Sequence, residues 1–115
     1  MNFIIRLLLN AAVAYGASLI LSGVHINDYL AAIGFALVLA VLNTFIKPLL
    51  IFLTLPITVL TLGLFLFVVN AIIIIIADKL MDSIRIDSFM YALALSLVLS
   101  AFSTAINALL NEKAG

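Results

Sequence analysis

Four long stretches of the chain carry no charged side chain, and short polar segments separate them. The stretches are Leu7–Val24, Tyr29–Ile46, Pro48–Ala77 and Ser88–Asn111. A helix of about 20 apolar residues, rising about 1.5 Å per residue, spans a hydrocarbon core of roughly 30 Å. The pattern therefore predicts an all-α membrane protein whose helices cross a lipid bilayer.

A closed β-barrel is the other structure that satisfies the backbone within lipid. Its strands would alternate polar and apolar residues, and the run Ile72–Ile76 does not. Helices are therefore expected here, although β-branched residues favour strands in soluble proteins. A cleaved signal peptide is an alternative for the first stretch, with Arg6 as its charged flank. Asn10 interrupts that stretch and three more follow, so we interpret it as an uncleaved span.

The third charge-free stretch is too long for one straight span, because 30 residues of helix would reach about 45 Å. Pro48 and Pro56 divide it, since proline removes a backbone donor and its ring clashes with the preceding turn. Thr54 precedes Pro56 and is expected to cap the next helix. Residues 48–55 then form a short apolar piece that either continues the second helix or lies in the membrane interface. We expect a four-transmembrane-helix bundle in one domain, residues 1–115, with spans at about 3–23, 29–47, 57–80 and 88–110.

The two halves of the chain resemble each other at an offset of 60 residues. Val24–Tyr29 and Ile84–Phe89 are both polar connectors that end in an aromatic residue, and Asn10-Ala11 corresponds to Asn70-Ala71. We therefore predict a tandem repeat of two helical hairpins, residues 1–50 and 61–110. Both copies would share one orientation, with the symmetry axis along the membrane normal.

Composition agrees with a lipid environment, because 68% of the residues are apolar and 9% are charged. In soluble proteins about 45–50% of the residues are apolar and about 25% are charged. Five basic and five acidic residues cancel and form no basic tract, so we expect no nucleic-acid partner. The chain has no cysteine, which excludes disulfides, thiolate metal sites and thiol nucleophiles.

Lysine and arginine near the span ends suggest an orientation, because cytoplasmic loops carry the excess of positive charge. One side would hold Arg6, Lys47 and Lys113, and the other Lys79 and Arg85 with His25. The larger group places both ends of the chain in the cytoplasm.

Small residues recur every four positions on the second and fourth predicted spans, and this spacing puts them on one face of each helix. Small residues let membrane helices approach closely, so we expect these seams to pack within or between subunits. Ser96, Ser100, Ser103 and Asn107 suggest a water-lined face as the alternative. The seam residues are Ala32, Ala36, Ala40 and Thr44, and Ala92, Ser96, Ser100 and Thr104.

Two amides, Asn10 and Asn70, lie within predicted spans. An amide in hydrocarbon needs a polar partner, so we expect a hydrogen bond between helices, with a solute or ion site as the alternative. Lys47 ends the second span and is expected to reach the head groups, with anionic-lipid binding as a further role. His25, with Asp28 nearby, is interpreted as a solvated connector residue. No catalytic, metal or cofactor motif is present.

The central part of the chain resembles phage holin family 4, the four-transmembrane holin superfamily IV of small bacterial membrane proteins. The resemblance rests on Asn43, Lys47-Pro48, Leu55-Pro56, Leu62-Gly63-Leu64-Phe65 and Asn70-Ala71. It implies a multi-pass protein of the bacterial inner membrane that forms homo-oligomers and opens holes. The matching positions are Asn43, Lys47, Pro48, Pro56, Gly63 and Asn70, with no role implied for each.

Three functions follow as hypotheses. The first is holin-like self-association that permeabilises the membrane. The second is a non-catalytic structural or accessory envelope protein. The third is a small dimeric transporter of a solute or lipid, with Asn10 and Asn70 near its site. An enzyme is not expected, because no ionisable residue lies at mid-depth in a predicted span.

Overall fold

The computed structural model describes residues 2–114, with side chains for residues 2–109. It is mostly helical, as expected, and three of its helices, α1, α2 and α5, are long and apolar enough to cross a membrane. The elements are α1 (Phe3–Ile20), β1 (Val24–Ile26), α2 (Tyr29–Leu53), α3 (Leu55–Leu60), α4 (Phe65–Leu80), β2 (Ile84–Ile86) and α5 (Phe89–Ala114).

The second helix runs past the predicted end at residue 47. Pro48 lies inside α2, which continues to Leu53. Proline removes one backbone hydrogen bond, a loss that helices within a membrane tolerate when neighbouring groups compensate. At its other end Asp28 caps α2, because its carboxylate accepts a hydrogen bond from the Ala31 amide at 2.8 Å.

The predicted third span, residues 57–80, is divided into two helices. Leu62 and Gly63 have φ values of 57° and 90°, so the chain leaves the right-handed helical region and α3 ends. The Thr61 hydroxyl then accepts a hydrogen bond from the Phe65 amide at 3.1 Å, at the start of α4. Thr54 does not cap α3 as predicted, because its hydroxyl donates to the Leu50 carbonyl at 2.8 Å.

Two connectors that were predicted as loops form a short antiparallel ribbon. β1 pairs with β2, and His25 lies opposite Arg85 at the centre. Two further backbone hydrogen bonds extend the pairing, from Asn27 N to Ser83 O at 3.1 Å and from Asp87 N to Gly23 O at 2.8 Å. The first and fourth predicted spans accordingly change, since α1 ends at Ile20 and α5 begins at Phe89.

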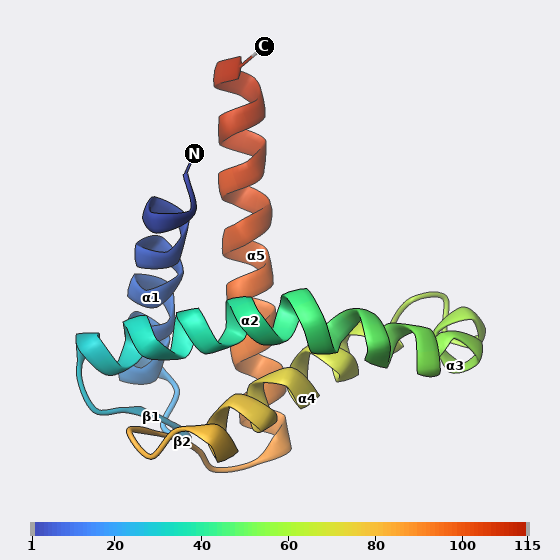
Figure 1. The fold of residues 1–115 in the computed structure, drawn as a ribbon, viewed down its shortest axis with the longest axis horizontal. Coiled ribbons are helices and arrows are strands. Elements are labelled where there is room, and N and C mark those ends of the chain that lie inside the picture. The colour runs from blue at the N-terminus through green and yellow to red at the C-terminus, as the bar shows by residue number, and fades with distance from the viewer. Residues whose placement is uncertain (1, 115) are drawn as a thin grey trace.

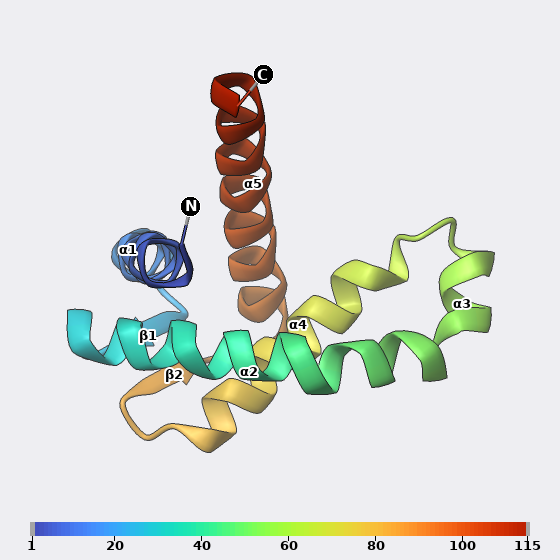
Figure 2. The ribbon, with the colours of Figure 1, turned by 45° about the horizontal axis from the view of Figure 1, so that its top comes forward.

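The four long helices form a ring in which each contacts two others. α1 contacts α2 and α5, and α4 also contacts α2 and α5. Within the described part of the chain, α1 does not contact α4, and α2 does not contact α5. In Figures 1 and 2, α2 runs across α1 and α5 rather than parallel to them. The C-terminal halves of α2 and α5 extend in different directions from a base beside the ribbon.

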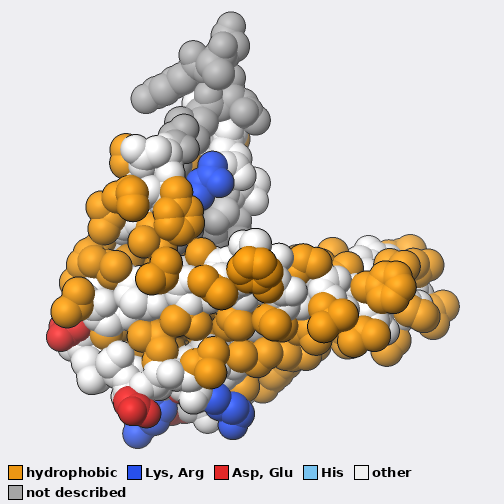
Figure 3. Space-filling model, viewed as in Figure 1, with side chains coloured by type: hydrophobic (Ala, Val, Ile, Leu, Met, Phe, Trp, Pro, Cys, Tyr) orange, Lys and Arg blue, Asp and Glu red, His pale blue; other side chains and the backbone are white. Residues whose placement is uncertain are grey.

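The buried core lies at this base, next to the ribbon. It joins inward residues of the strands, such as Val24 and Ile84, to Phe35 of α2 and Leu95 of α5. Much of the remaining apolar surface is exposed, as on Leu60 and Leu62 near α3. Figure 3 shows apolar side chains covering the helices, with acidic and most basic side chains gathered near the ribbon. Such a surface suits acyl chains rather than water.

Candidate functional site

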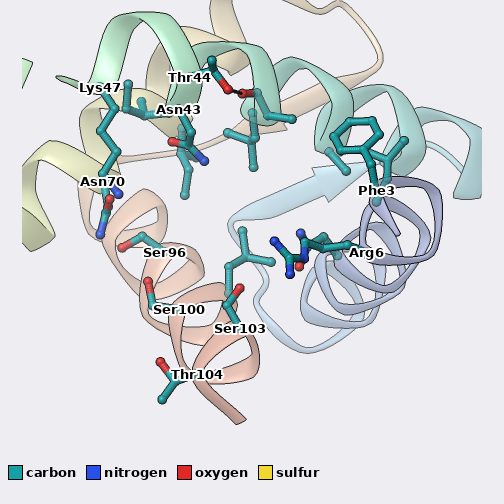
Figure 4. Close-up of a pocket in the computed structure, with 18 residues that line it drawn as sticks. Phe3, Arg6, Asn43, Thr44, Lys47, Asn70, Ser96, Ser100, Ser103 and Thr104 are labelled. Carbon is teal, nitrogen blue, oxygen red and sulfur yellow. Dashed lines mark hydrogen bonds between the residues drawn. The ribbon is translucent and has the colours of Figure 1, made fainter. Parts of the chain in front are cut away.

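A cavity of about 520 Å³ lies between the four long helices, and its wall combines polar and apolar side chains. We call it the polar cavity, and Figure 4 shows side chains from α1, α2, α4 and α5 around it. Its volume is within the range of about 300–1,000 Å³ that is usual for small-molecule sites. Its polar lining residues are Arg6, Asn10, Asn43, Thr44, Lys47, Asn70, Ser96, Ser100, Ser103 and Thr104.

Helical periodicity explains why these side chains meet. On α1, Arg6 and Asn10 are four residues apart and share a face. On α2, Asn43 and Lys47 have the same spacing, and both line the polar cavity. Within this apolar chain, polar residues at that spacing form a stripe along one helix face, and here the stripe lines the polar cavity.

The predicted seams divide between the core and the polar cavity. Ala32 and Ala92, at the start of each seam, are buried in the core at 0% exposure. The remaining seam residues line the polar cavity, namely Ala36, Ala40, Thr44, Ser96, Ser100 and Thr104. Because α2 and α5 make no direct contact within the described chain, packing of the seams between subunits stays a prediction.

The water-lined face considered for the fourth span corresponds to part of this wall. Ser96, Ser100 and Ser103 line the polar cavity, and Ser103 also lines a smaller neighbouring cavity of about 70 Å³ with Arg6 and Asn107. The Ser96 hydroxyl donates to the Leu93 carbonyl at 2.7 Å, so its hydrogen bond is made within its own helix.

Asn10 and Asn70 lie on the same cavity but do not bond to each other. Each lines the polar cavity, and the helices that carry them, α1 and α4, do not contact one another in the described structure. The predicted hydrogen bond between helices is thus absent for this pair. Both amides instead face a space in which water or a ligand could hydrogen-bond to them.

Charge in the polar cavity has one sign. Arg6 and Lys47 both line it, and no aspartate or glutamate is among the described residues around it. Lys47 is half-buried, whereas Arg6 is more exposed. In Figure 4 the Arg6 side chain enters from α1, and Lys47 extends from α2 toward the wall formed by α4.

The family-motif residues have different locations. Asn43 and Lys47 line the polar cavity. Pro48 directly follows Lys47 within α2, and Pro56 is in the first turn of α3. Gly63 provides the left-handed turn before α4. The motif thus combines two cavity residues with residues that shape the α2–α4 connection.

A second polar cluster lies at the ribbon. His25 Nε2 is 3.0 Å from Asp87 Oδ2, and Arg85 Nε is 3.1 Å from Asp87 Oδ1. The hydrogen bond with His25 lowers the pKa of Asp87, and the charge of Arg85 acts in the same direction. The partner of His25 is therefore Asp87 rather than Asp28. Among the described residues, no group of three or more histidines and acids has metal-site geometry.

Sequence reasoning missed the role of Arg6, which was used only as evidence for orientation. Its spacing of four from Asn10 was the available signal, since both lie on one face of α1. The strands were also missed, although Val24-His25-Ile26 and Ile84-Arg85-Ile86 alternate apolar and polar residues as strands do. Lys113 lies outside the residues with described side chains.

Comparisons with known proteins give the chain a consistent set of relatives. A family model described as mycobacterial 4 TMS phage holin, superfamily IV, matches residues 1–105. The uncharacterized membrane protein YvlD of Bacillus subtilis is 44% identical over 99 residues, which cover 85% of this chain and 83% of YvlD. The uncharacterized protein SCO3922 of Streptomyces coelicolor is 35% identical over 121 residues, covering 96% and 97%. No solved structure matches.

Proposed function

Because the chain belongs to the family described as mycobacterial 4 TMS phage holin, superfamily IV, we propose that it is a non-catalytic membrane protein that self-associates and permeabilises the bacterial inner membrane. The observation that carries this proposal is the polar cavity. It places hydroxyls, amides and two cations on the inner faces of helices whose other faces are apolar.

The cavity wall requires a polar environment, since an amide or hydroxyl without a partner is costly in hydrocarbon. Water in the cavity would satisfy Asn10, Asn70 and the serines of α5. A water-filled volume inside a membrane protein is the first requirement of a permeation path.

One copy alone does not provide a complete path. Ile73 and Ile74 line the polar cavity and also belong to the buried core that extends to the ribbon. A hole must therefore open through this core or form between copies that turn their polar walls toward one another. The second route fits the proposal of self-association, with the polar segments of α2 and α5 lining the shared space.

The exposed surface supports association. The chain exposes 6,985 Å², whereas a compact protein of 12.4 kDa would expose about 6,100 Å². In each candidate span, at most 17% of the most apolar window is buried. Lipid or a second copy must cover the rest, and the small residues on α2 and α5 suit close helix contacts between copies.

We further propose four crossings of the membrane. α4 has 16 residues and would rise about 24 Å, which is short of a core of roughly 30 Å. Adding α3 gives a broken span, residues 55–80, as the four-span description of the family would require.

The tandem repeat of residues 1–50 and 61–110 is part of this proposal. Corresponding elements lie 60 residues apart, since β1 and β2 begin at Val24 and Ile84, and α2 and α5 at Tyr29 and Phe89. Six pairs of cavity residues have the same offset. These pairs are Asn10 with Asn70, Ala36 with Ser96, Leu39 with Leu99, Ala40 with Ser100, Asn43 with Ser103 and Thr44 with Thr104.

For orientation we propose that the ribbon faces outward and that the chain ends are cytoplasmic. The excess of lysine and arginine at the ends opposite the ribbon supports this. Ser83→Cys, in the connector before β2, should then react with an impermeant maleimide in intact cells. Reaction only in inside-out vesicles would reverse the orientation.

Inducible expression in a bacterium tests permeabilisation directly, with a membrane-potential dye and a co-expressed cytoplasmic endolysin. The wild type should depolarise the cells and release the enzyme. The double variant Ser100→Leu/Ser103→Leu should depolarise them much less, whereas Ala101→Leu, at an exposed position of the same helix, should act as the wild type. Abundant inserted protein that leaves both readouts unchanged would contradict the proposal.

A second candidate is a dimeric transporter or binding protein for a small solute or lipid. The observation that favours it is the buried core between the polar cavity and the ribbon, because packed apolar residues suit binding better than open flow. Under this alternative, expression leaves the membrane potential intact, and Asn10→Leu/Asn70→Leu abolishes ligand binding. An accessory envelope protein would show neither effect.

A further inference from the structure

We propose that the polar cavity binds the phosphate group of a membrane lipid, with Arg6 and Lys47 as its two cationic contacts. This inference does not depend on permeabilisation, because a lipid can occupy the cavity whether or not holes form. It rests on the charge, the hydrogen-bonding groups and the wall of the cavity.

The net positive charge of the polar cavity favours the binding of an anion. Arg6 and Lys47 contribute two positive charges, and no acid lines the cavity among the described residues. The ion pairs in the described structure lie at the ribbon, where both involve Asp87. Two cations that share a cavity repel each other, and the repulsion increases as the surrounding dielectric constant falls. A bound anion would remove this cost.

The neutral groups around the two cations can donate hydrogen bonds to phosphate oxygens. Asn10, Asn43 and Asn70 carry amide N–H groups, and Ser100 and Ser103 carry hydroxyls. None of these side chains makes a hydrogen bond within the described structure. All of them line the polar cavity, and Figure 4 shows Asn43, Asn70, Ser100 and Ser103 around one space. Phosphate oxygens are acceptors, Arg can bind two of them at once, and Lys adds a point charge.

The wall favours a lipid over free phosphate. Phe3, Leu7, Leu39 and Leu99 also line the polar cavity, and an inorganic anion gains nothing from them. A volume of about 520 Å³ is larger than a phosphate group needs, and the surplus suits a glycerol backbone and the start of its acyl chains.

The positions of the cations also suit a lipid head group. Arg6 lies in the first turns of α1, whereas Lys47 lies late in α2, which runs away from the ribbon. Both line the polar cavity. Basic side chains near the ends of membrane-spanning helices reach lipid phosphates at the membrane surface.

Native mass spectrometry of the purified full chain, released from nanodiscs, tests the site. The nanodiscs contain phosphatidylcholine with a minor fraction of phosphatidylglycerol, and the readout is phosphatidylglycerol retained per protein. Arg6→Gln and Lys47→Gln should each weaken retention about tenfold, since each removes a charge-assisted hydrogen bond. Lys47→Arg should restore most of it. Lys79→Gln removes an exposed cation outside the cavity and should leave retention unchanged.

Inorganic phosphate provides the second arm, added to protein in detergent without anionic lipid. The lipid would be overturned as the source of the bound phosphate group by two results together. Inorganic phosphate would bind in a manner that depends on Arg6 and Lys47, and the protein would retain no phosphatidylglycerol. Retention unaffected by either glutamine variant, or reduced equally by Lys79→Gln, would overturn the site itself. Arg6→Gln and Lys47→Gln are each compared with the wild type for thermal unfolding and elution volume, which identifies a misfolded variant. If one of them misfolds, the retention measured for the other variant tests the site.

Discussion

The Nε2 atom of His25 lies 3.0 Å from Oδ2 of Asp87, and this contact joins the two halves of the chain across the ribbon. Arg85 lies opposite His25 in the strand pairing and bonds to the other carboxylate oxygen at 3.1 Å. One carboxylate thus receives bonds from both central residues of the ribbon. The contact holds the two connectors together at the ribbon.

The lowered pKa of Asp87 predicts a loss of stability in acid. The hydrogen bond with His25 is its main cause. A carboxyl with a lowered pKa in the folded state stabilises that state above its ordinary value of 3.8, and the contribution is lost as the pH falls through the lowered pKa. In thermal unfolding in detergent, the wild type should be more stable than Asp87→Asn near neutral pH, and this difference in stability should disappear below about pH 4.

The control for this comparison is Asp82→Asn, because Asp82 forms no ion pair within the described structure. It should follow the wild-type pH profile. An Asp87→Asn profile parallel to the wild type between pH 6 and about pH 3 would show that the contact with His25 does not contribute to folding.

Gly23 should be intolerant of a side chain. A Cβ atom there would overlap the Tyr91 ring, which packs over the connector and whose hydroxyl lies 3.0 Å from Ser22 Oγ. Gly23→Ala should therefore destabilise the protein by about 1–3 kcal/mol. Gly16→Ala is the matched control, since nothing lies within 4 Å of its added Cβ, and in helix α1 it should stabilise by about 0.5–1 kcal/mol. Equal melting temperatures for the two variants would refute the packing argument.

Substitution by valine should have opposite effects on stability at two threonines near the α3–α4 turn. The Thr61 hydroxyl accepts from the Phe65 amide, so Thr61→Val should destabilise by about 1 kcal/mol. The Thr58 hydroxyl is buried without a hydrogen-bond partner in the described structure, so Thr58→Val should stabilise by about 1 kcal/mol. Chemical unfolding in mixed micelles measures both, and a destabilised Thr58→Val would indicate a partner for that hydroxyl.

Sequence reasoning predicted the membrane class and most helix positions because apolar runs depend on composition alone. It did not predict how the helices continue or break. Pro48 was interpreted as the end of the second span, with residues 48–55 either continuing that helix or lying in the interface, and the structure continues α2 to Leu53. Gly63 was noted only as part of a motif, although a glycine after α3 is a typical signal for a left-handed helix end.

The polar cavity was only partly predictable. The four-residue spacing on α2 and α5 identified the faces that meet it, but spacing cannot tell a packing seam from a cavity wall. That choice depends on which helices are neighbours, and the ring places α1 and α4 between α2 and α5. Arg6 contributes from a helix distant in sequence, so no local pattern links it with Lys47.

The central claim is that water reaches the inner face of α5 while its outer face meets lipid. The chain has no native cysteine, so single cysteines can report on this with an impermeant maleimide. Ser100 lines the polar cavity, and Leu97, on the same helix, is 45% exposed on the apolar surface. In inside-out vesicles Ser100→Cys should react readily and Leu97→Cys hardly at all. Equal reactivity at the two positions, or an unreactive Ser100→Cys beside a reactive Arg6→Cys, would contradict the account.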